Sequence, residues 1–334
     1  MLFSATYTTS GLSELFRQSF YAVIGIILAS CCLFIDYRVF PKIAVFIYAI
    51  VIILLIAVMF IGHEALGAQR WLPLGHFGSF QPSEIAKLGL IISLASFFSK
   101  QEEAVNWKTF LLTAIHVGIP ALLIMKQPDL GTALVLAAFT FGMLFVIGYN
   151  PFLLIAILFG AGGGMIRFLN DYQRTRLLIF LDPNRDPQGG GWNIIQSMIA
   201  VGSGGLFGKG LLSGTQTQLK FVPEHHTDFI FTVLAEETGF VGGVILFLLY
   251  FLLLWFATRI ALNAKDRLGR FLAVGIAVMF LFHILVNVGM TMQIMPITGI
   301  PLPFISFGGS ALLTNFMAVG VLLNIHFRQD NLIP

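Results

Sequence analysis

Two carboxylates stand where a long polar segment meets an apolar run, and side chains of this type can move protons. Glu224 and Asp228 stand at the junction between the segment 170–227 and the apolar run that begins at Phe229. A carboxylate at such a boundary is partly desolvated, which favours a role as general base. Asp228 is therefore the candidate base, with Glu224 as a polar group beside it.

The same segment carries basic residues that suit a phosphorylated ligand. Arg174, Arg176 and Lys209 lie within it, and Arg70 lies in another loop. Guanidinium groups offer forked donors to phosphate or pyrophosphate oxygens. The alternative is that these charges only solvate an external face. Glu224 and the basic groups are thus candidates for substrate binding.

Further polar residues accompany the apolar runs. Glu84 and Lys87 are three residues apart, so on a helix they share a face and can pair. Arg70 and Trp71 have the types expected of groups anchored at a membrane interface, which is the plain alternative to substrate contact. Asp129 opens another run, where a carboxylate favours a helix N-terminus without further function.

Other kinds of site are not supported. The stretch 202–210, GSGGLFGKG, lacks the first glycine and the final Ser/Thr of a phosphate-binding loop. No His/Cys cluster has zinc spacing, and the adjacent Cys31 and Cys32 suit an apolar helix. We expect no protein metal centre, although a divalent cation could accompany the substrate. The net charge of +3 gives no indication of nucleic acid binding.

These groups must be positioned by membrane-spanning helices. Of 334 residues, 57% are hydrophobic and 10% are charged, which is far below the charge of a soluble domain. Apolar runs predict an all-α polytopic protein of about nine transmembrane helices, at 19–35, 43–61, 85–98, 110–125, 130–148, 151–168, 229–257, 271–292 and 304–325. We expect a single membrane domain over 1–334.

The distribution of Lys and Arg predicts the orientation. One set of short loops and the C-terminus are rich in these residues, namely Arg38, Lys42, Lys100, Lys108, Arg259, Lys265, Arg267, Arg270 and Arg328. That side should be cytoplasmic, and the large loop 170–227 should be extracytoplasmic. Its apolar patches 177–181 and 192–201 predict short amphipathic helices. Nine spans place the N-terminus outside, and one further helix before it would place both ends inside.

Several segments together resemble the SEDS family (shape, elongation, division and sporulation proteins). They include GAQRWLPLG, FQPSEIAKL, KQPDLGTALV, DPNRDPQGGGWNIIQS, HHTDFIFTVLAEETGFVG and PITGIPLPFISFGGSAL. The resemblance covers the chain from about Asp36 onward. The sequence of the large loop resembles RodA, which acts in lateral wall elongation, more than FtsW, which acts in division.

The resemblance implies a ten-helix fold, here without its first helix, and a peptidoglycan glycosyltransferase of the bacterial inner membrane. The enzyme would polymerise lipid II into glycan strands during elongation and maintenance of rod shape. Expected partners are lipid II, the growing strand, a class B penicillin-binding protein and other elongation-complex membrane proteins. The family's catalytic Asp maps to Asp228, its Trp to Trp71, and its Glu–Lys pair to Glu84 and Lys87.

Two other functions are weighed against the transferase. A lipid II flippase would distribute polar residues through the bilayer, whereas here most motif charges gather at the outer face. A non-enzymatic scaffold for the penicillin-binding protein would leave the many polar groups of the loop unexplained.

Overall fold

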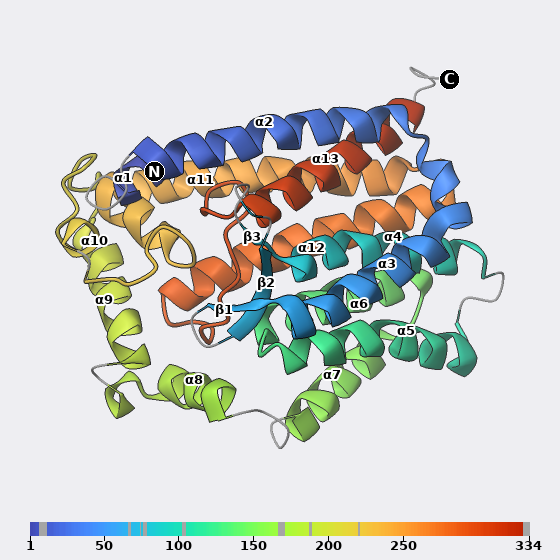
Figure 1. The fold of residues 1–334 in the computed structure, drawn as a ribbon, viewed down its shortest axis with the longest axis horizontal. Helices are drawn as coiled ribbons and strands as arrows, with labels where there is room; N and C mark the ends of the chain where they lie inside the picture. Colours follow the sequence, from blue (N-terminus) through green and yellow to red (C-terminus); the bar gives the residue numbers. More distant parts are fainter. Residues whose placement is uncertain are drawn as a thin grey trace. The chain divides into compact units, whose positions relative to one another are not determined.

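The computed structural model describes residues 1–6, 12–65, 68–73, 75, 79–101, 105–165, 171–186, 189–219 and 221–329. Figure 1 follows the chain through its elements. Within the large loop, residues 170, 187–188 and 220 lie outside the described residues.

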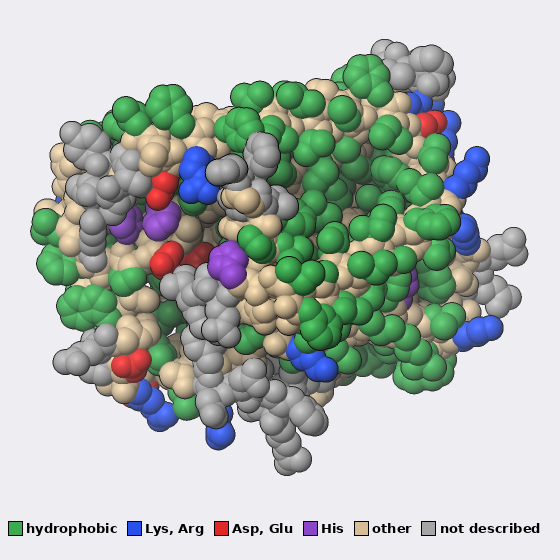
Figure 2. Space-filling model, viewed as in Figure 1, with side chains coloured by type: hydrophobic (Ala, Val, Ile, Leu, Met, Phe, Trp, Pro, Cys, Tyr) green, Lys and Arg blue, Asp and Glu red, His purple; other side chains and the backbone are tan. Residues whose placement is uncertain are grey.

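Each expected apolar run coincides with a helix. The helices are α2 (Leu12–Phe34), α3 (Phe40–Ile61), α4 (Pro82–Ser99), α5 (Trp107–Lys126), α6 (Leu130–Ile147), α7 (Pro151–Met165), α11 (Ile230–Asn263), α12 (Arg267–Thr291) and α13 (Gly309–Gln329). In the described part of the chain, seven of them are long and apolar enough to span a membrane. The other two are α4, which begins with a charged pair, and α7, which has 15 residues. The all-α membrane fold is confirmed, and large side chains exposed along the spans are mostly hydrophobic, as on the face in Figure 2.

The shorter elements are α1 (Leu2–Thr6), η1 (Tyr37–Val39), β1 (His63–Ala65), β2 (Ala68–Pro73), β3 (Ser79–Phe80), α8 (Asp171–Leu181), η4 (Pro183–Arg185), α9 (Gly190–Ser203) and α10 (Thr215–Gln218). Helices α8 and α9 contain the two apolar patches of the large loop, as expected. The last long helix begins at Gly309 rather than at 304, because Phe304 has a φ of 63° and the preceding backbone is irregular.

The chain divides into two compact units, each assembled from separate segments. The first unit comprises Met1–Val23, Leu169–Leu254 and Leu281–Leu312, and the second comprises Ile24–Phe168, Trp255–Phe280 and Leu313–Pro334.

In the second unit, α3, α4, α5 and α6 pack against one another. Glycines allow close approach between helices: a Cβ on Gly142 would lie 2.7 Å from Val278, and one on Gly275 would lie 2.8 Å from Ile91. A small antiparallel sheet, ordered β1-β2-β3, joins α3 to α4 and was not expected from the sequence. It pairs Trp71 with His63 and Leu72 with Phe80.

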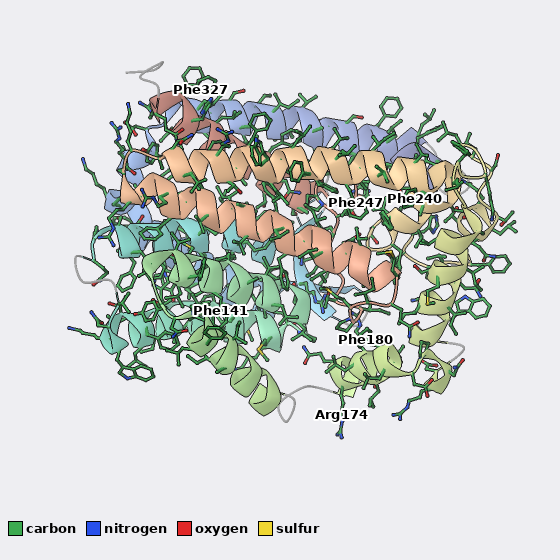
Figure 3. The ribbon with its side chains drawn as sticks, turned by 180° about the vertical axis from the view of Figure 1, so that it is seen from behind. Phe141, Arg174, Phe180, Phe240, Phe247 and Phe327 are labelled. Carbon is green, nitrogen blue, oxygen red and sulfur yellow. The ribbon has the colours of Figure 1, made fainter. Side chains whose placement is uncertain are left out.

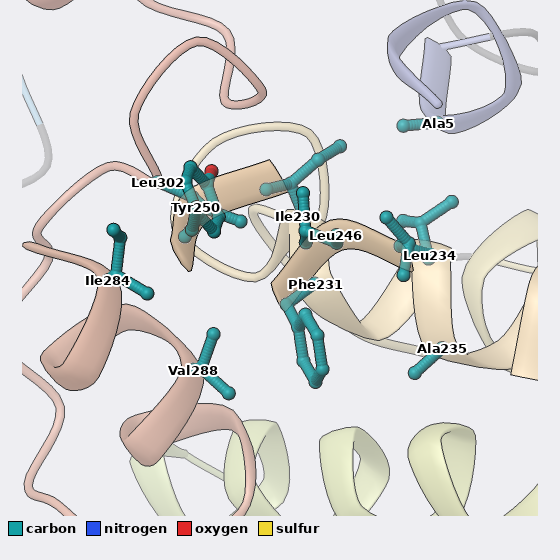
Figure 4. Packing of buried hydrophobic residues seen from close by; sticks show 11 residues of the cluster. Ala5, Ile230, Phe231, Leu234, Ala235, Leu246, Tyr250, Ile284, Val288 and Leu302 are labelled. Carbon is teal, nitrogen blue, oxygen red and sulfur yellow. The ribbon is translucent and has the colours of Figure 1, made fainter. Parts of the chain in front are cut away.

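In the first unit, a hydrophobic cluster contains residues of α1, α11 and α12 and of the segment that follows α12. Its α11 residues lie at 230–235 and at 246–250. Figure 4 shows its members, which include Ile230, Phe231, Leu246, Ile284 and Leu302. The hydroxyl of Tyr250 in this cluster donates to the Pro303 carbonyl at 2.7 Å. The cluster therefore holds the beginning of α11 against the irregular segment before α13.

Helix α11 is broken at Gly239, whose φ is 65° and ψ is −161°. The residues 204–210, which we call the glycine segment, supply the hydrogen bonds that the break leaves open. The amides of Lys209 and Gly210 donate to the carbonyls of Glu236 and Glu237 at 3.0 and 3.1 Å. In return, the amides of Phe240 and Val241 donate to the carbonyls of residues 205 and 206 at 2.9 and 3.1 Å. Irregular backbone at membrane depth needs such internal partners.

The glycines of this segment are required by close backbone contact rather than by phosphate binding. A Cβ on Gly204 would lie 2.0 Å from the Ala235 carbonyl oxygen, and one on Gly208 would lie 2.1 Å from the Glu237 carbonyl oxygen. Gly208 also has a φ of 77°, which favours glycine.

Candidate functional site

The first unit brings Asp228 and Arg176 to the same glycine. If Gly299 carried a Cβ, that atom would lie 3.3 Å from Asp228 Oδ2 and 3.8 Å from Arg176 Nη1. Gly299 has a φ of 73°, which fits its place in the irregular segment between α12 and α13. Arg176 Nη1 also donates to the Ile297 carbonyl at 3.3 Å. A half-buried carboxylate and a half-buried guanidinium thus flank one short stretch of backbone.

The backbone that carries Asp228 is tied to α12 and to the segment after it. Three consecutive carbonyls accept hydrogen bonds: His226 from the Phe307 amide at 3.0 Å, Thr227 from Ser306 Oγ at 2.7 Å, and Asp228 from Asn287 Nδ2 at 2.8 Å. We call these three bonds the carbonyl clamp. Asp228 therefore stands on a backbone that is fixed directly before α11 begins.

The position of Arg176 follows from how α8 packs. Ile179 is buried in a cluster with Ile194, Phe229 and Ile297, and it lies three residues after Arg176, on the same helix face. Arg174 lies two residues before Arg176, which on a helix is the opposite side. Its side chain is exposed and projects away from α8 (Figure 3). Of the two α8 arginines that were expected to bind phosphate, only Arg176 is brought to Asp228.

Glu224 forms the turn that precedes Asp228. Its carbonyl accepts from the amides of Thr227 and Phe229, both at 3.2 Å, and its φ is 51°. Its carboxylate accepts from Thr227 Oγ1 at 3.2 Å. The described contacts of Glu224 thus shape the backbone of the turn.

Lys209 pairs with a buried carboxylate of α11. Its Nζ lies 2.8 Å from Glu236 Oε1 and donates to Thr215 Oγ1 at 2.8 Å. Glu236 also accepts from the amides of Gln216 and Thr217 at 2.9 and 3.0 Å, so it caps the short helix α10. These contacts place Glu236 and Lys209 in a structural hydrogen-bond network.

The remaining predicted residues belong to the second unit. Arg70, on β2, donates from Nε to the Gln127 carbonyl at 2.9 Å and from Nη2 to the Pro128 carbonyl, so it anchors the junction between α5 and α6. Trp71 follows it on the strand and is half-buried. Asp129 caps α6 by accepting from the Thr132 amide at 3.1 Å, as expected.

Glu84 and Lys87 form the predicted pair. Their charged atoms lie 2.8 Å apart in the first turns of α4, and both side chains are almost wholly buried. Burial of this pair inside the helix bundle is consistent with a structural role, and the pairing alone does not indicate contact with a substrate.

Asn287, Gly299 and Ser306 are site residues that the sequence did not single out for chemistry. The sequence does contain a signal: the prolines at 296, 301 and 303 and the glycines at 299, 308 and 309 indicate irregular backbone, which at membrane depth must be buried or line a cavity. That signal located the segment but could not show which side chains reach Asp228.

The spanning helices, together with a carboxylate and an arginine placed beside one glycine, define the class as a polytopic membrane protein. Comparison with known proteins gives the family. The chain belongs to the FtsW/RodA/SpoVE family, described as cell cycle proteins and also called SEDS, whose model matches residues 1–331. It is a peptidoglycan glycosyltransferase.

Relatives with two different names have the same percentage identity to this chain. The chain is 41% identical to the peptidoglycan glycosyltransferase MrdB of Escherichia coli K12, covering 99% of this chain and 90% of that protein. It is also 41% identical to a probable peptidoglycan glycosyltransferase FtsW of Trichlorobacter lovleyi, covering 92% and 82%. Among solved structures, a chain from a peptidoglycan synthase complex matches with a TM-score of 0.83 and 36% identity, covering 98% of this chain and 94% of that one.

Proposed function

We propose that this protein polymerises lipid II into glycan strands at the outer face of the bacterial inner membrane during cell elongation, with Asp228 as the general base. The observation that carries the proposal is the placement of the Asp228 carboxylate and the Arg176 guanidinium beside Gly299. One group can accept a proton and the other can neutralise a phosphate, and glycosyl transfer from a lipid pyrophosphate needs both.

The reaction is an inverting displacement. Asp228 takes the proton of the acceptor sugar hydroxyl as its oxygen attacks the anomeric carbon of the donor. The bond from that carbon to the lipid pyrophosphate breaks, and the pyrophosphate leaves with the electron pair. Arg176 stabilises the growing negative charge on the leaving group. One carboxylate suffices, unlike the pair that hydrolysis of a glycoside uses.

Relatives named MrdB and FtsW have the same percentage identity to this chain, so identity does not separate elongation from division. Support for an elongation role comes instead from the sequence of the large loop and the start of the next helix, GSGGL-GKG-GTQ-Q and DFIF-VLAEE. Expression in cells depleted of their elongation polymerase tests this role. Return of the rod shape supports it, whereas rescue only of cells depleted of the division enzyme would replace elongation with division.

The partner we propose is a class B penicillin-binding protein. The supporting observation is the similarity to a chain from a complex that couples polymerization and crosslinking. Co-purification of the two membrane proteins in detergent tests the association, and separate elution at micromolar concentration would contradict a stable complex.

The decisive experiment measures polymerisation of labelled lipid II by the purified protein with its class B partner. Asp228→Asn keeps the shape of the side chain and removes the base, so we expect loss of product chains by a factor of about 10² or more. Asp182→Asn is the matched control, because Asp182 is a partly exposed carboxylate of the same loop that pairs with Arg185.

A wild-type rate in folded Asp228→Asn would reject the base assignment. If wild type formed no polymer but moved lipid II across vesicle membranes, the flippase would replace the transferase.

A further inference from the structure

We infer that Asn287 is a positioning residue for Asp228, and that Gly299 provides the clearance in which the carboxylate is held. The inference rests on the proposed function of Asp228 and adds how the fold places its reactive atoms. We do not propose that Asn287 touches the reacting groups; it acts through the backbone of Asp228.

Asn287 links two segments of the first unit through a single amide. It is fully buried in α12, and Nδ2 donates both to the Asp228 carbonyl and to the Ile300 carbonyl, each at 2.8 Å. Ile300 directly follows Gly299. The same nitrogen therefore fixes the backbone of Asp228 and the backbone that the carboxylate of Asp228 faces.

Stability alone does not account for an asparagine at this position. Its Oδ1 is buried and makes no hydrogen bond within the described part of the chain. An unsatisfied buried acceptor lowers stability, so a residue that keeps one is expected to have another use. The distances indicate what that use is: Nδ2 has two hydrogens, and each is donated to a different carbonyl, that of Asp228 or that of Ile300.

Ser306, another donor of the carbonyl clamp, also fixes the backbone beside Asp228. Ser306 Oγ donates to the Thr227 carbonyl, and the same oxygen accepts from the Leu302 amide at 2.8 Å. The irregular segment is thereby closed on itself and attached beside Asp228. Preorganisation matters because a reacting group displaced by about 1 Å can lose on the order of 10²-fold in rate.

Gly299 sets the other limit on the carboxylate. At a φ of 73° any larger residue is strained, and a Cβ there would approach Asp228 Oδ2 to 3.3 Å. An alanine at 299 would therefore press on the carboxylate, whereas Arg176 Nη1, at 3.8 Å, would be in ordinary van der Waals contact. The clamp fixes the backbone of Asp228, and Gly299 leaves the space that its side chain occupies.

The test is steady-state polymerisation of labelled lipid II by the complex of wild-type or Asn287→Leu protein with its class B partner. Leucine keeps the number and branching of the side-chain heavy atoms and removes both N–H donors. We expect kcat to fall by about tenfold or more, with KM for lipid II unchanged within about twofold, because misplacement of the base affects the chemical step.

Ser197→Ala is the matched control. Ser197 is also fully buried in the first unit, and its hydroxyl donates to a backbone carbonyl, that of Thr291 at the end of α12, at 2.8 Å. This variant should lower the thermal midpoint and leave kcat near wild type. Ser306→Ala, which removes one clamp bond, is the milder second variant, and it should lower kcat several-fold.

The outcomes separate the two hypotheses. Loss of activity in Asp228→Asn together with wild-type kcat in Asn287→Leu overturns the positioning role and leaves the base intact. A wild-type rate in Asp228→Asn rejects the proposed function instead. If Asn287→Leu does not fold, a wild-type kcat in Ser306→Ala overturns the inference, and a reduced kcat at unchanged KM supports it.

Discussion

The two arginines of α8 carry the same charge but should differ in function. Arg176 lies beside Asp228 and Gly299, whereas Arg174 is exposed on the opposite side of the helix. We predict that Arg176→Ala lowers kcat/KM for lipid II by about tenfold or more, because a charge-assisted contact with pyrophosphate is lost. Arg174→Ala should change it less than about threefold, as is usual for an exposed charge.

The comparison is made in the same polymerisation assay, with circular dichroism as the control for folding. Equal losses in the two variants would show that α8 contributes a diffuse positive field rather than one placed guanidinium. Arg174 would then regain the phosphate-binding role that the sequence predicted for it.

Glu84 and Lys87 form a second case where structure and function can be separated. Lys87→Met leaves the Glu84 carboxylate buried without its partner, and we predict a loss of about 3–5 kcal/mol in stability. The double variant Glu84→Leu with Lys87→Met should recover most of that loss, because similar apolar volume often replaces a buried pair without penalty.

Thermal unfolding in detergent measures both effects. Polymerisation by the stable double variant then decides the role of the pair. Normal turnover indicates a structural pair, and loss of turnover in a stable protein indicates the substrate contact that the family resemblance implies.

Whether a contact between two residues could be predicted depended on how far apart they lie in the sequence. The Glu84–Lys87 pair and the Asp129 cap were predictable, since both partners lie within one helical turn. The sequence also grouped Arg174 with Arg176 by composition, although residues two apart on a helix face different directions. Asn287 could not be predicted as a neighbour of Asp228, because only the tertiary fold brings them together.

At the scale of elements, the break in α11 depends on the glycine segment. We predict that Gly208→Ala destabilises the protein by more than about 2 kcal/mol, because the new methyl would collide with the Glu237 carbonyl at a φ of 77°. Gly202→Ala is the matched control. Apart from its chain neighbours and the nearby backbone of its own helix, no described atom lies within 4 Å of its Cβ position, and alanine in helix α9 should stabilise by about 0.5–1 kcal/mol.

The thermal midpoints of the two purified variants check this prediction. Equal midpoints would mean that the glycine segment can move away from α11 at little cost, which would contradict its role in closing the break.

The elements themselves were largely predictable, because apolar runs of spanning length mark helices in a membrane. The break at Gly239 was not, since the hydrogen bonds that compensate for it come from another segment of the chain. The short sheet that carries Arg70 and Trp71 was missed as well, since its strands have only two to six residues.

For the whole molecule, the distribution of positive charge predicts which loops face the cytoplasm. In a Cys31→Ala, Cys32→Ala background, a cysteine at Asn184 in the large loop should react with a membrane-impermeant maleimide added to intact spheroplasts. A cysteine at Asn263, at the end of α11, should react only after the membrane is permeabilised. Both side chains are exposed, so reactivity reports the side of the membrane.

The reverse labelling pattern would invert the topology and place Asp228 on the cytoplasmic side. The large loop could then no longer meet lipid II at the outer face. Labelling of both cysteines in sealed cells would instead indicate a leaky preparation, which a cytoplasmic marker enzyme detects.

The carbonyl clamp also has a consequence for biosynthesis. The glycine segment and the broken part of α11 are close in the chain, so their backbone bonds can form soon after α11 leaves the ribosome. The donors of the clamp, Asn287, Ser306 and Phe307, are translated later. The reactive carboxylate is therefore fixed only when the segment before α13 has been inserted, and a truncated nascent chain would hold the base without its final geometry.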